Sequence, residues 1–230
     1  MSAELSTTTF PLYPPWHLHG DAFILNYWLT LKFIAQHRSF YIAPSPIGRV
    51  VQVMLVRYHD SPVAPYDELL ILDHPLMSKR RLSSIPKIYV STEASMVNGQ
   101  HFWGIPKQLA QFEWLIHEDI VYCTIRFDQQ EMSLCLQKYK HSQNFYVNSH
   151  HLPARLLNIQ QAWQGSRYQF TPQFRGKLSK LKQASWKNTQ AIFPDFSQAR
   201  YLHSFYVPEF SLTLPKAKIE KKIGVSRETP

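Results

Sequence analysis

The chain contains few of the residues that typify several classes of protein. Only two of its 230 residues are cysteine and seven are glycine. Two cysteines are too few for a disulfide framework, and the glycines form no phosphate-binding loop. Charged residues make up 18% of the chain, fewer than in a typical disordered protein. With 44% hydrophobic residues, residues 1–230 are therefore expected to form one domain with a sizeable core.

Long apolar runs are also missing. The longest, Ala22 to Ala35, is interrupted by Asn26 and Lys32 and is too short to span a bilayer as a helix. The first ten residues, MSAELSTTTF, have neither the basic start nor the apolar block of a signal peptide. We therefore expect a cytoplasmic protein without a membrane partner.

Acidic residues are outnumbered, at 16 against 25 lysines and arginines, which gives a net charge of +9. Much of the excess lies late in the chain, at Arg175, Lys177, Lys180, Lys182, Lys187, Lys216, Lys218, Lys221 and Lys222. Because no nucleic-acid recognition motif accompanies these residues, we interpret them as a solvated face and a flexible basic tail from about residue 216. No nucleic-acid partner is expected.

The cysteines and histidines suggest neither a crosslink nor a metal. Strands near residues 120–127 and 132–139 would bring Cys123 and Cys135 close together, but free thiols are expected in a cytoplasmic protein. The pairs His17-x-His19 and His150-His151 have no third ligand at a known spacing. We expect no metal and no cofactor.

Strand patterns dominate the chain. Alternating or continuous runs of aliphatic and aromatic residues predict strands at 19–31, 50–58, 68–72, 87–92, 111–116, 120–127 and 132–139. Helical patterns are scarce, with one turn expected at 106–109 and a segment at 177–186. The 16 prolines are scattered, which favours loops over long helices. These patterns predict a mostly β (α+β), antiparallel, barrel-like domain.

One lysine has unusually apolar neighbours. The stretch NGQHFWGIPKQLAQF, Asn98 to Phe112, places Lys107 in an expected loop among bulky side chains. Burial disfavours a charged amine, and a neutral amine can attack a carbonyl carbon. The alternative is a structural junction whose lysine extends to water. Trp103 in the same stretch is equally compatible with lining a pocket and with packing in the core.

Two segments of the chain match a known pattern. Gly99, Pro106, Lys107 and Leu109 form a Gly-x₆-Pro-Lys-x-Leu pattern, and the segment Tyr58-His-Asp-Ser-Pro-Val-Ala-Pro-Tyr-Asp-Glu68 lies at the expected distance before it. Together they resemble the acetoacetate decarboxylase-like superfamily, over about a third of the chain.

The resemblance implies Schiff-base chemistry in a barrel that often forms homo-oligomers. Lys107 matches the amine nucleophile of the family, and Glu68 matches an active-site carboxylate. A β-keto acid would condense with Lys107 to an iminium, which accepts the electrons released as carbon dioxide leaves. The substrate is thus a small carbonyl compound or keto acid. The residues expected to contact it are Met54, Phe102, Trp103 and Gln108.

The chain departs from the family pattern at charged positions. Gln108 replaces a second lysine, Gln100-His101 replaces an arginine-glutamate pair, and Met54 replaces a second glutamate. The expected arginine of the N-terminal strand falls near Asp21. Without that arginine a carboxylate binds less well, which argues against acetoacetate itself.

Two functions of different classes remain open. The first is a lyase-type enzyme that uses Lys107, with decarboxylation as the reference reaction and aldol-type or hydration chemistry equally permitted. The second is a non-catalytic protein that keeps the barrel and binds a small molecule in its pocket. The presence of both Lys107 and Glu68 favours the enzyme, since a binding pocket has no evident need for the pair.

Overall fold

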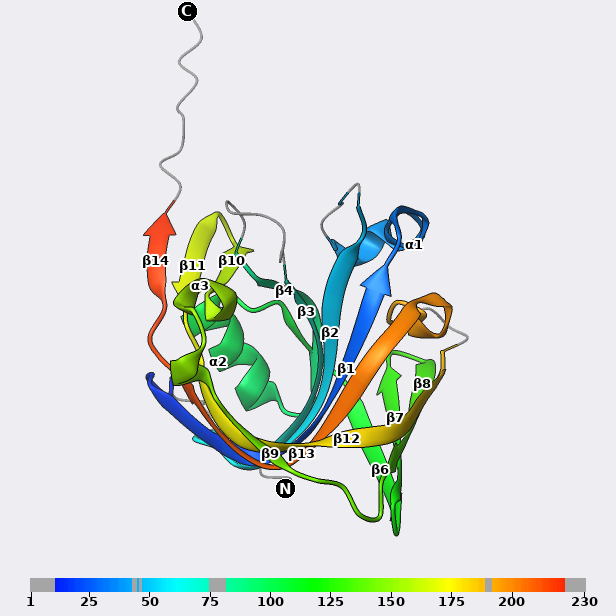
Figure 1. Cartoon of the computed structure of the whole chain (residues 1–230). Helices are drawn as coiled ribbons and strands as arrows, with labels where there is room; N and C mark the ends of the chain where they lie inside the picture. Colours follow the sequence, from blue (N-terminus) through cyan, green and yellow to red (C-terminus); the bar gives the residue numbers. More distant parts are fainter. Residues whose placement is uncertain (1–10, 43–44, 46, 75–81, 189–191, 222–230) are drawn as a thin grey trace, which may run out of the picture.

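The chain folds into one strongly curved sheet with a smaller sheet beside it (Figure 1). The computed structural model describes residues 11–42, 45, 47–74, 82–188 and 192–221. Eleven strands form the large sheet, in the order β5-β4-β3-β2-β1-β13-β12-β8-β7-β6, with β9 also paired to β12. Their bounds are β1 (Trp16–Leu29), β2 (Arg49–Asp60), β3 (Tyr66–Asp73), β4 (Ser84–Val90), β5 (Lys107–Leu109), β6 (Gln111–His117), β7 (Ile120–Phe127), β8 (Gln130–Lys138), β9 (Phe145–Asn148), β12 (Gln173–Lys187) and β13 (Arg200–Leu214).

The remaining elements are short. The small sheet contains β10 (Ile159–Trp163), β11 (Ser166–Phe170) and β14 (Lys218–Lys221). The helices are α1 (Leu31–Gln36), α2 (Glu93–Trp103) and α3 (Ala154–Leu157), with 3-10 turns η1 (Arg38–Phe40), η2 (Ser149–His151) and η3 (Phe196–Gln198). Helix α2 lies between the small sheet and β3–β4 (Figure 1).

The two edge strands of the large sheet are consecutive in the chain. β5 ends at Leu109, β6 begins at Gln111, and the N–H of Ala110 between them donates to the carbonyl of Val90 at 2.9 Å. A sheet whose first and last strands are joined by a single residue must curl back on itself. The predicted mostly β, barrel-like fold is therefore confirmed, with the seven predicted strands present as β1–β4 and β6–β8.

The central strands bury both of their faces. Successive side chains of a strand point to opposite faces, so Leu69 and Ile71 of β3 pack on one side of the sheet and Leu70 on the other. The first side faces β6–β8, and the second faces α2 and the small sheet. A strand buried on both faces requires a continuous apolar run, which explains the sequence Leu69 to Leu72.

The helical predictions were wrong. Lys107 is not in a loop or a helical turn but begins β5, and residues 177–186 belong to the long strand β12. The helix of this region is α2, which starts at the N-cap Thr92, whose hydroxyl accepts from the N–H of Ser95 at 3.4 Å. It ends at Gly104, where φ is +60°, a left-handed conformation that glycine adopts at little cost.

Part of the basic C-terminal region forms a strand. The expected flexible tail from about residue 216 is wrong for Lys218–Lys221, which form β14 and pair with β11. Residues 222–230 lie outside the described residues. The solvated basic face is present, because alternate residues of β12 point outward, and the exposed ones include Arg175, Lys177, Lys180, Lys182 and Lys187.

Two further predictions concern cysteines and membrane helices. Cys123 and Cys135 lie on the paired strands β7 and β8, and both thiols are free, as predicted. Among the described residues, no helix is long and apolar enough to cross a membrane.

Candidate active site

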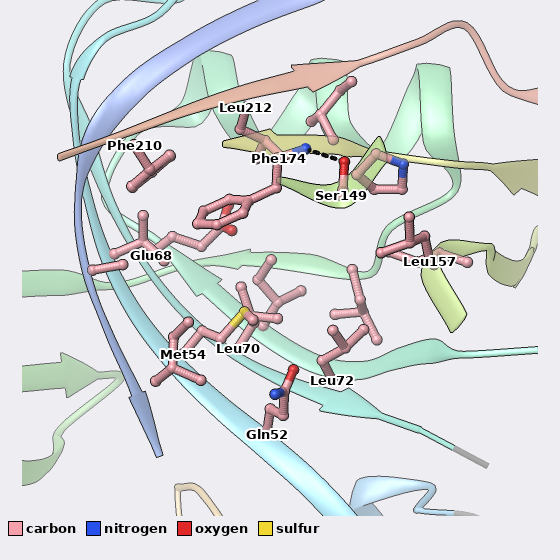
Figure 2. A pocket seen from close by; sticks show the side chains of 18 of the residues that line it. Gln52, Met54, Glu68, Leu70, Leu72, Ser149, Leu157, Phe174, Phe210 and Leu212 are labelled. Carbon is pink, nitrogen blue, oxygen red and sulfur yellow. Dashed lines mark hydrogen bonds between the residues drawn. The ribbon is translucent and has the colours of Figure 1, made fainter. Parts of the chain in front are cut away.

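A cavity of about 330 Å³ lies inside the curve of the large sheet (Figure 2). Strands β1, β2 and β3 form one wall, and residues of η2, α3 and β11–β13 contribute to the opposite side. Most of the lining side chains are aliphatic or aromatic. The polar ones are Gln52, Tyr58, Tyr66, Glu68, His74, Lys107 and Ser149. An apolar cavity with a few polar groups that converge at one place is the usual form of a small-molecule site.

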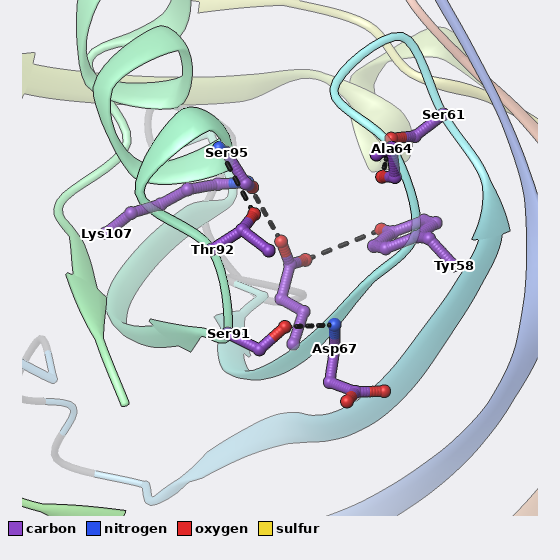
Figure 3. A network of polar contacts seen from close by, with 9 residues as sticks. Tyr58, Ser61, Ala64, Asp67, Ser91, Thr92, Ser95 and Lys107 are labelled. Atoms are coloured by element: carbon purple, nitrogen blue, oxygen red, sulfur yellow. Dashed lines mark hydrogen bonds and ion pairs between the residues drawn. The ribbon is translucent and has the colours of Figure 1, made fainter. Parts of the chain in front are cut away.

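Lys107 reaches this cavity from β5 and is only 3% exposed. Its Nζ donates to Glu68 Oε2 and to Ser95 Oγ, each at 2.9 Å. The Tyr66 ring lies beneath the amine, with 5.1 Å between Nζ and the ring centroid. Figure 3 shows Lys107 and Ser95 approaching from β5 and α2, whereas Tyr58 contacts the other oxygen of the Glu68 carboxylate.

Gly99 makes room for the Lys107 side chain. A Cβ atom added at Gly99 would lie 2.6 Å from Lys107 Cδ and 2.7 Å from Cε, far inside van der Waals contact. Gly99 is in α2, and the turn at Gly104 brings the chain back so that Lys107 passes beside the helix. The glycine is therefore needed for close approach and not for an unusual backbone angle.

Two tyrosines surround the Glu68 carboxylate. Tyr58 donates from its hydroxyl to Glu68 Oε1 at 3.4 Å, and Tyr66 lies two residues before Glu68 on the same face of β3. Burial, followed by the nearby charge of Glu68, raises the pKa of both phenols well above the usual value. Both therefore remain protonated and are available as hydrogen-bond donors throughout the physiological range.

The sequence matches the family model of acetoacetate decarboxylase over residues 39–188, about two thirds of the chain, including Glu68, Ser95 and Lys107. The chain belongs to the acetoacetate decarboxylase family.

Several solved structures share the fold of this chain. Acetoacetate decarboxylase from Legionella pneumophila subsp. pneumophila str. Philadelphia 1 is 15% identical, with a TM-score of 0.67 over 90% of this chain and 87% of that one. The enduracididine biosynthesis enzyme MppR complexed with pyruvate is 14% identical, with a TM-score of 0.60 and 93% of each chain covered. An acetoacetate decarboxylase-like enzyme from Sphingomonas wittichii RW1 is 11% identical, with a TM-score of 0.62 over 96% of this chain and 98% of that one. A search of curated protein sequences gives no match.

The expected substrate-contacting residues of this family member are not all at the cavity. Met54 lines the cavity and is paired with Leu70, two positions further along β3 than Glu68. Gln108 points elsewhere and accepts a hydrogen bond from Lys87 of the neighbouring strand β4. Phe102 and Trp103 pack in the core, and the Trp103 indole donates to the carbonyl of Pro215 at 2.7 Å. Of the four, only Met54 lies where it can touch a ligand in this cavity.

Gln108 and Lys107 are separated by the geometry of a strand. Adjacent residues of β5 point to opposite faces, so a side chain at position 108 is directed away from the cavity into which Lys107 points. Burial lowers the pKa of Lys87, which contacts Gln108 and the rings of Tyr89 and Phe127. Lys87 therefore belongs to a cluster with Gln108, Tyr89 and Phe127 that is separate from the cavity.

Asp21, the position near the expected family arginine, also lies outside the cavity. Its carboxylate, 13% exposed, contacts His59 Nε2 at 2.6 Å, on the face of β1 opposite to Ala22 and Ile24, which line the cavity.

Sequence reasoning missed three residues of the site. Tyr58 and Tyr66 lie in the segment that led to Glu68, and Tyr66 is two positions before it, which in a strand means the same face. Ser95 is four residues before Gly99, on the same side of a helix, so recognising α2 would have revealed it. Among the described residues, no group of three or more His, Cys, Asp or Glu side chains is placed to hold a metal ion.

Proposed function

We propose that this chain is an enzyme that forms a Schiff base between Lys107 and the carbonyl carbon of a keto acid or related compound. The observation that carries the proposal is the buried contact of Lys107 Nζ with Glu68 Oε2 at 2.9 Å, within an apolar cavity. A reactive amine needs a base to take its proton, and here the base is in direct contact with it.

The first step is transfer of a proton from the amine of Lys107 to Glu68. The transfer converts a buried ion pair into a neutral pair, and the loss of both charges together reduces the cost of burial. Ser95 Oγ accepts a second hydrogen bond from the amine, which holds the nitrogen in place beside the cavity. The neutral amine then adds to the carbonyl carbon.

Dehydration of the resulting carbinolamine requires a proton on the departing oxygen. Glu68, once protonated, is placed to supply it, and the protonated phenols of Tyr58 and Tyr66 are placed to donate hydrogen bonds. The product is an iminium, whose positive charge again faces the Glu68 carboxylate. An apolar cavity excludes water that would hydrolyse this intermediate early.

The iminium permits two reactions. In a β-keto acid, the bond to the carboxylate breaks, carbon dioxide leaves, and the electron pair moves into an enamine that is protonated and hydrolysed. In a neutral ketone, Glu68 removes an α-proton and the same enamine forms, ready for aldol-type bond formation. The second candidate draws support from the structure of MppR complexed with the condensation product of pyruvate and imidazole 4-carboxaldehyde, a protein of the same fold.

Exchange of α-hydrogens for deuterium tests the proposal. Acetone and pyruvate are incubated with the protein in D₂O and followed by proton NMR, with Lys107→Met and Glu68→Gln in parallel. We expect exchange with the wild-type protein, none above background with Lys107→Met, and a rate at least about 100-fold lower with Glu68→Gln. Absence of exchange and of carbon dioxide release from β-keto acids would instead favour a non-catalytic pocket protein.

A further inference from the structure

The wall of the cavity beyond Glu68 is apolar on two adjacent strands. Along β3, the residues that share a face with Glu68 are Leu70 and Leu72. Register pairs place Val56 opposite Glu68 and Met54 opposite Leu70. From the carboxylate outward, this wall therefore presents aliphatic and thioether groups.

The opposite side of the cavity is apolar as well. Leu157 of α3, Phe174 of β12 and Leu212 of β13 face Met54 and the leucines of β3 across the cavity (Figure 2). These residues come from elements far apart in the chain, and together with β2 and β3 they surround a hydrophobic channel.

The channel becomes more exposed with distance from Lys107. Glu68 and Leu70 are 5% and 6% exposed, whereas Leu72 and Gln52, which are paired across β2 and β3, are half-buried. The cavity-facing side chains of β2 also become more exposed toward Gln52. The mouth therefore lies at the Gln52–Leu72 end, and the reactive amine lies at the deep end.

The distance between the two ends sets the length of an occupant. Four residues separate Glu68 from Leu72, which corresponds to roughly 13 Å along a strand. Carbon–carbon bonds of about 1.5 Å at near-tetrahedral angles advance roughly 1.25 Å each, so this span matches an extended chain of about ten carbons. The volume of about 330 Å³ has room for a chain of this size.

We propose that the carbonyl compound bound by Lys107 carries an unbranched apolar chain of about ten carbons, which lies along β2 and β3 toward the mouth. The inference rests on the proposed function for the position of the carbonyl group. A substrate as small as acetoacetate leaves the walls around Met54, Leu72 and Leu157 in contact with water. An apolar chain removes these walls from water, and burial of each methylene group is favourable.

A homologous series of 2-alkanones tests the proposed apolar chain of the substrate directly. Acetone through 2-tridecanone are incubated with the protein, reduced with cyanoborohydride, and the concentration that gives half-maximal adduct is measured by intact mass spectrometry. The transfer free energy of a methylene predicts that the concentration for half-maximal adduct decreases roughly fourfold per added carbon. The decrease should level off near ten carbons, where the chain reaches solvent. A series without dependence on chain length would overturn the inference.

A bulky residue near the mouth provides the matched test. Leu72→Trp should reduce the dependence on chain length, whereas Leu115→Trp, at a residue of β6 that is 65% exposed, should leave it unchanged. If Leu72→Trp fails to fold by circular dichroism, Leu157→Trp tests the same channel from the opposite side. An unchanged series in a folded channel variant would count against the proposed path of the chain.

The failure of this inference can be distinguished from the failure of the proposed function. If Lys107 forms no imine, no ketone of any length gives an adduct on Lys107, which peptide mass spectrometry checks, and the proposed function fails. Calorimetric binding of 2-nonanone and acetone to Lys107→Met then tests separately whether the cavity binds an apolar chain, because this variant cannot form an imine. Binding of 2-nonanone at least 100-fold tighter than acetone would support the channel, and equal binding would overturn it.

Discussion

Removing the charge of Lys107 should destabilise the protein far more than removing an exposed lysine. The two partners of the pair Lys107–Glu68 are 3% and 5% exposed, so Lys107→Met leaves a buried carboxylate without its cation. Breaking a buried pair in this way typically costs about 3–5 kcal/mol. In a chain of this length, that loss lowers the melting temperature by roughly 6–20 °C. Methionine has a similar length, so little of the effect comes from an empty cavity.

A double variant separates the charge effect from loss of packing. Lys107→Met with Glu68→Gln removes both charges and keeps an amide that Tyr58 can still contact. We expect the double variant to recover about 2 kcal/mol or more of the stability lost in Lys107→Met, because paired removal of buried charges is often nearly neutral. The free energy of unfolding is measured for all variants by urea denaturation at pH 7, followed by tryptophan fluorescence.

The exposed Lys177→Met serves as the control and should change stability by no more than about 0.5 kcal/mol. The reasoning would be refuted if Lys107→Met were as stable as this control. It would also be refuted if the losses of the two single variants simply added in the double variant, since additivity would mean that the charges do not interact.

Three further predictions concern the surroundings of the pair. Gly99→Ala places a methyl group 2.6 Å from Lys107 Cδ, so α-hydrogen exchange should slow by about 100-fold. Stability in urea should fall by about 1–3 kcal/mol, because displacing the buried lysine costs more than the helix preference of alanine restores. Ser95→Ala removes one hydrogen-bond acceptor from the buried amine and should lower the free energy of unfolding by about 1–3 kcal/mol in the same denaturation assay. Ser95→Thr keeps a hydroxyl and should retain most of the wild-type stability. Burial, and then the charge of Arg49, lowers the pKa of His74 from 6.5 to about 4. The unfolded chain therefore binds the proton first as pH falls, so stability is constant above about pH 6.5 and declines toward pH 4 by on the order of 3 kcal/mol, and His74→Gln should lack this component of the decline.

Much of the fold could be predicted because strands leave a direct trace in the sequence. The run Glu68 to Leu72 and the hairpin 111–127 appear in the structure close to their expected bounds. Helix α2 was missed because the stretch around Gly99 was expected to be a loop, although the structure uses Gly99 inside the helix for the approach of Lys107. The error at 177–186 has another cause. Alternate lysines on an exposed strand face resemble the charged face of a helix when no sheet partner is known.

The site was predictable only where residues could be recognised from a local pattern. Lys107 and Glu68 came from two such segments, and the structure brings their side chains within 2.9 Å. Gln108 was selected because it replaces a second lysine of the family pattern, and Trp103 because it lies in the same stretch as Lys107. In a strand and a helix, however, side chains that are near in sequence point in different directions. The apolar channel could not be predicted from the sequence. Its wall combines residues of β2, β3, α3, β12 and β13, and the tertiary fold decides how these elements are placed against one another.

The central claim is that Lys107 forms an imine with a carbonyl substrate. The most direct measurement is borohydride reduction in the presence of acetone, pyruvate and 2-nonanone, followed by peptide mass spectrometry to locate the modified residue. The account predicts a single adduct on Lys107, absent from Lys107→Met and unaffected by Lys177→Met. Adducts spread over many surface lysines, with Lys107 unmodified, would contradict it.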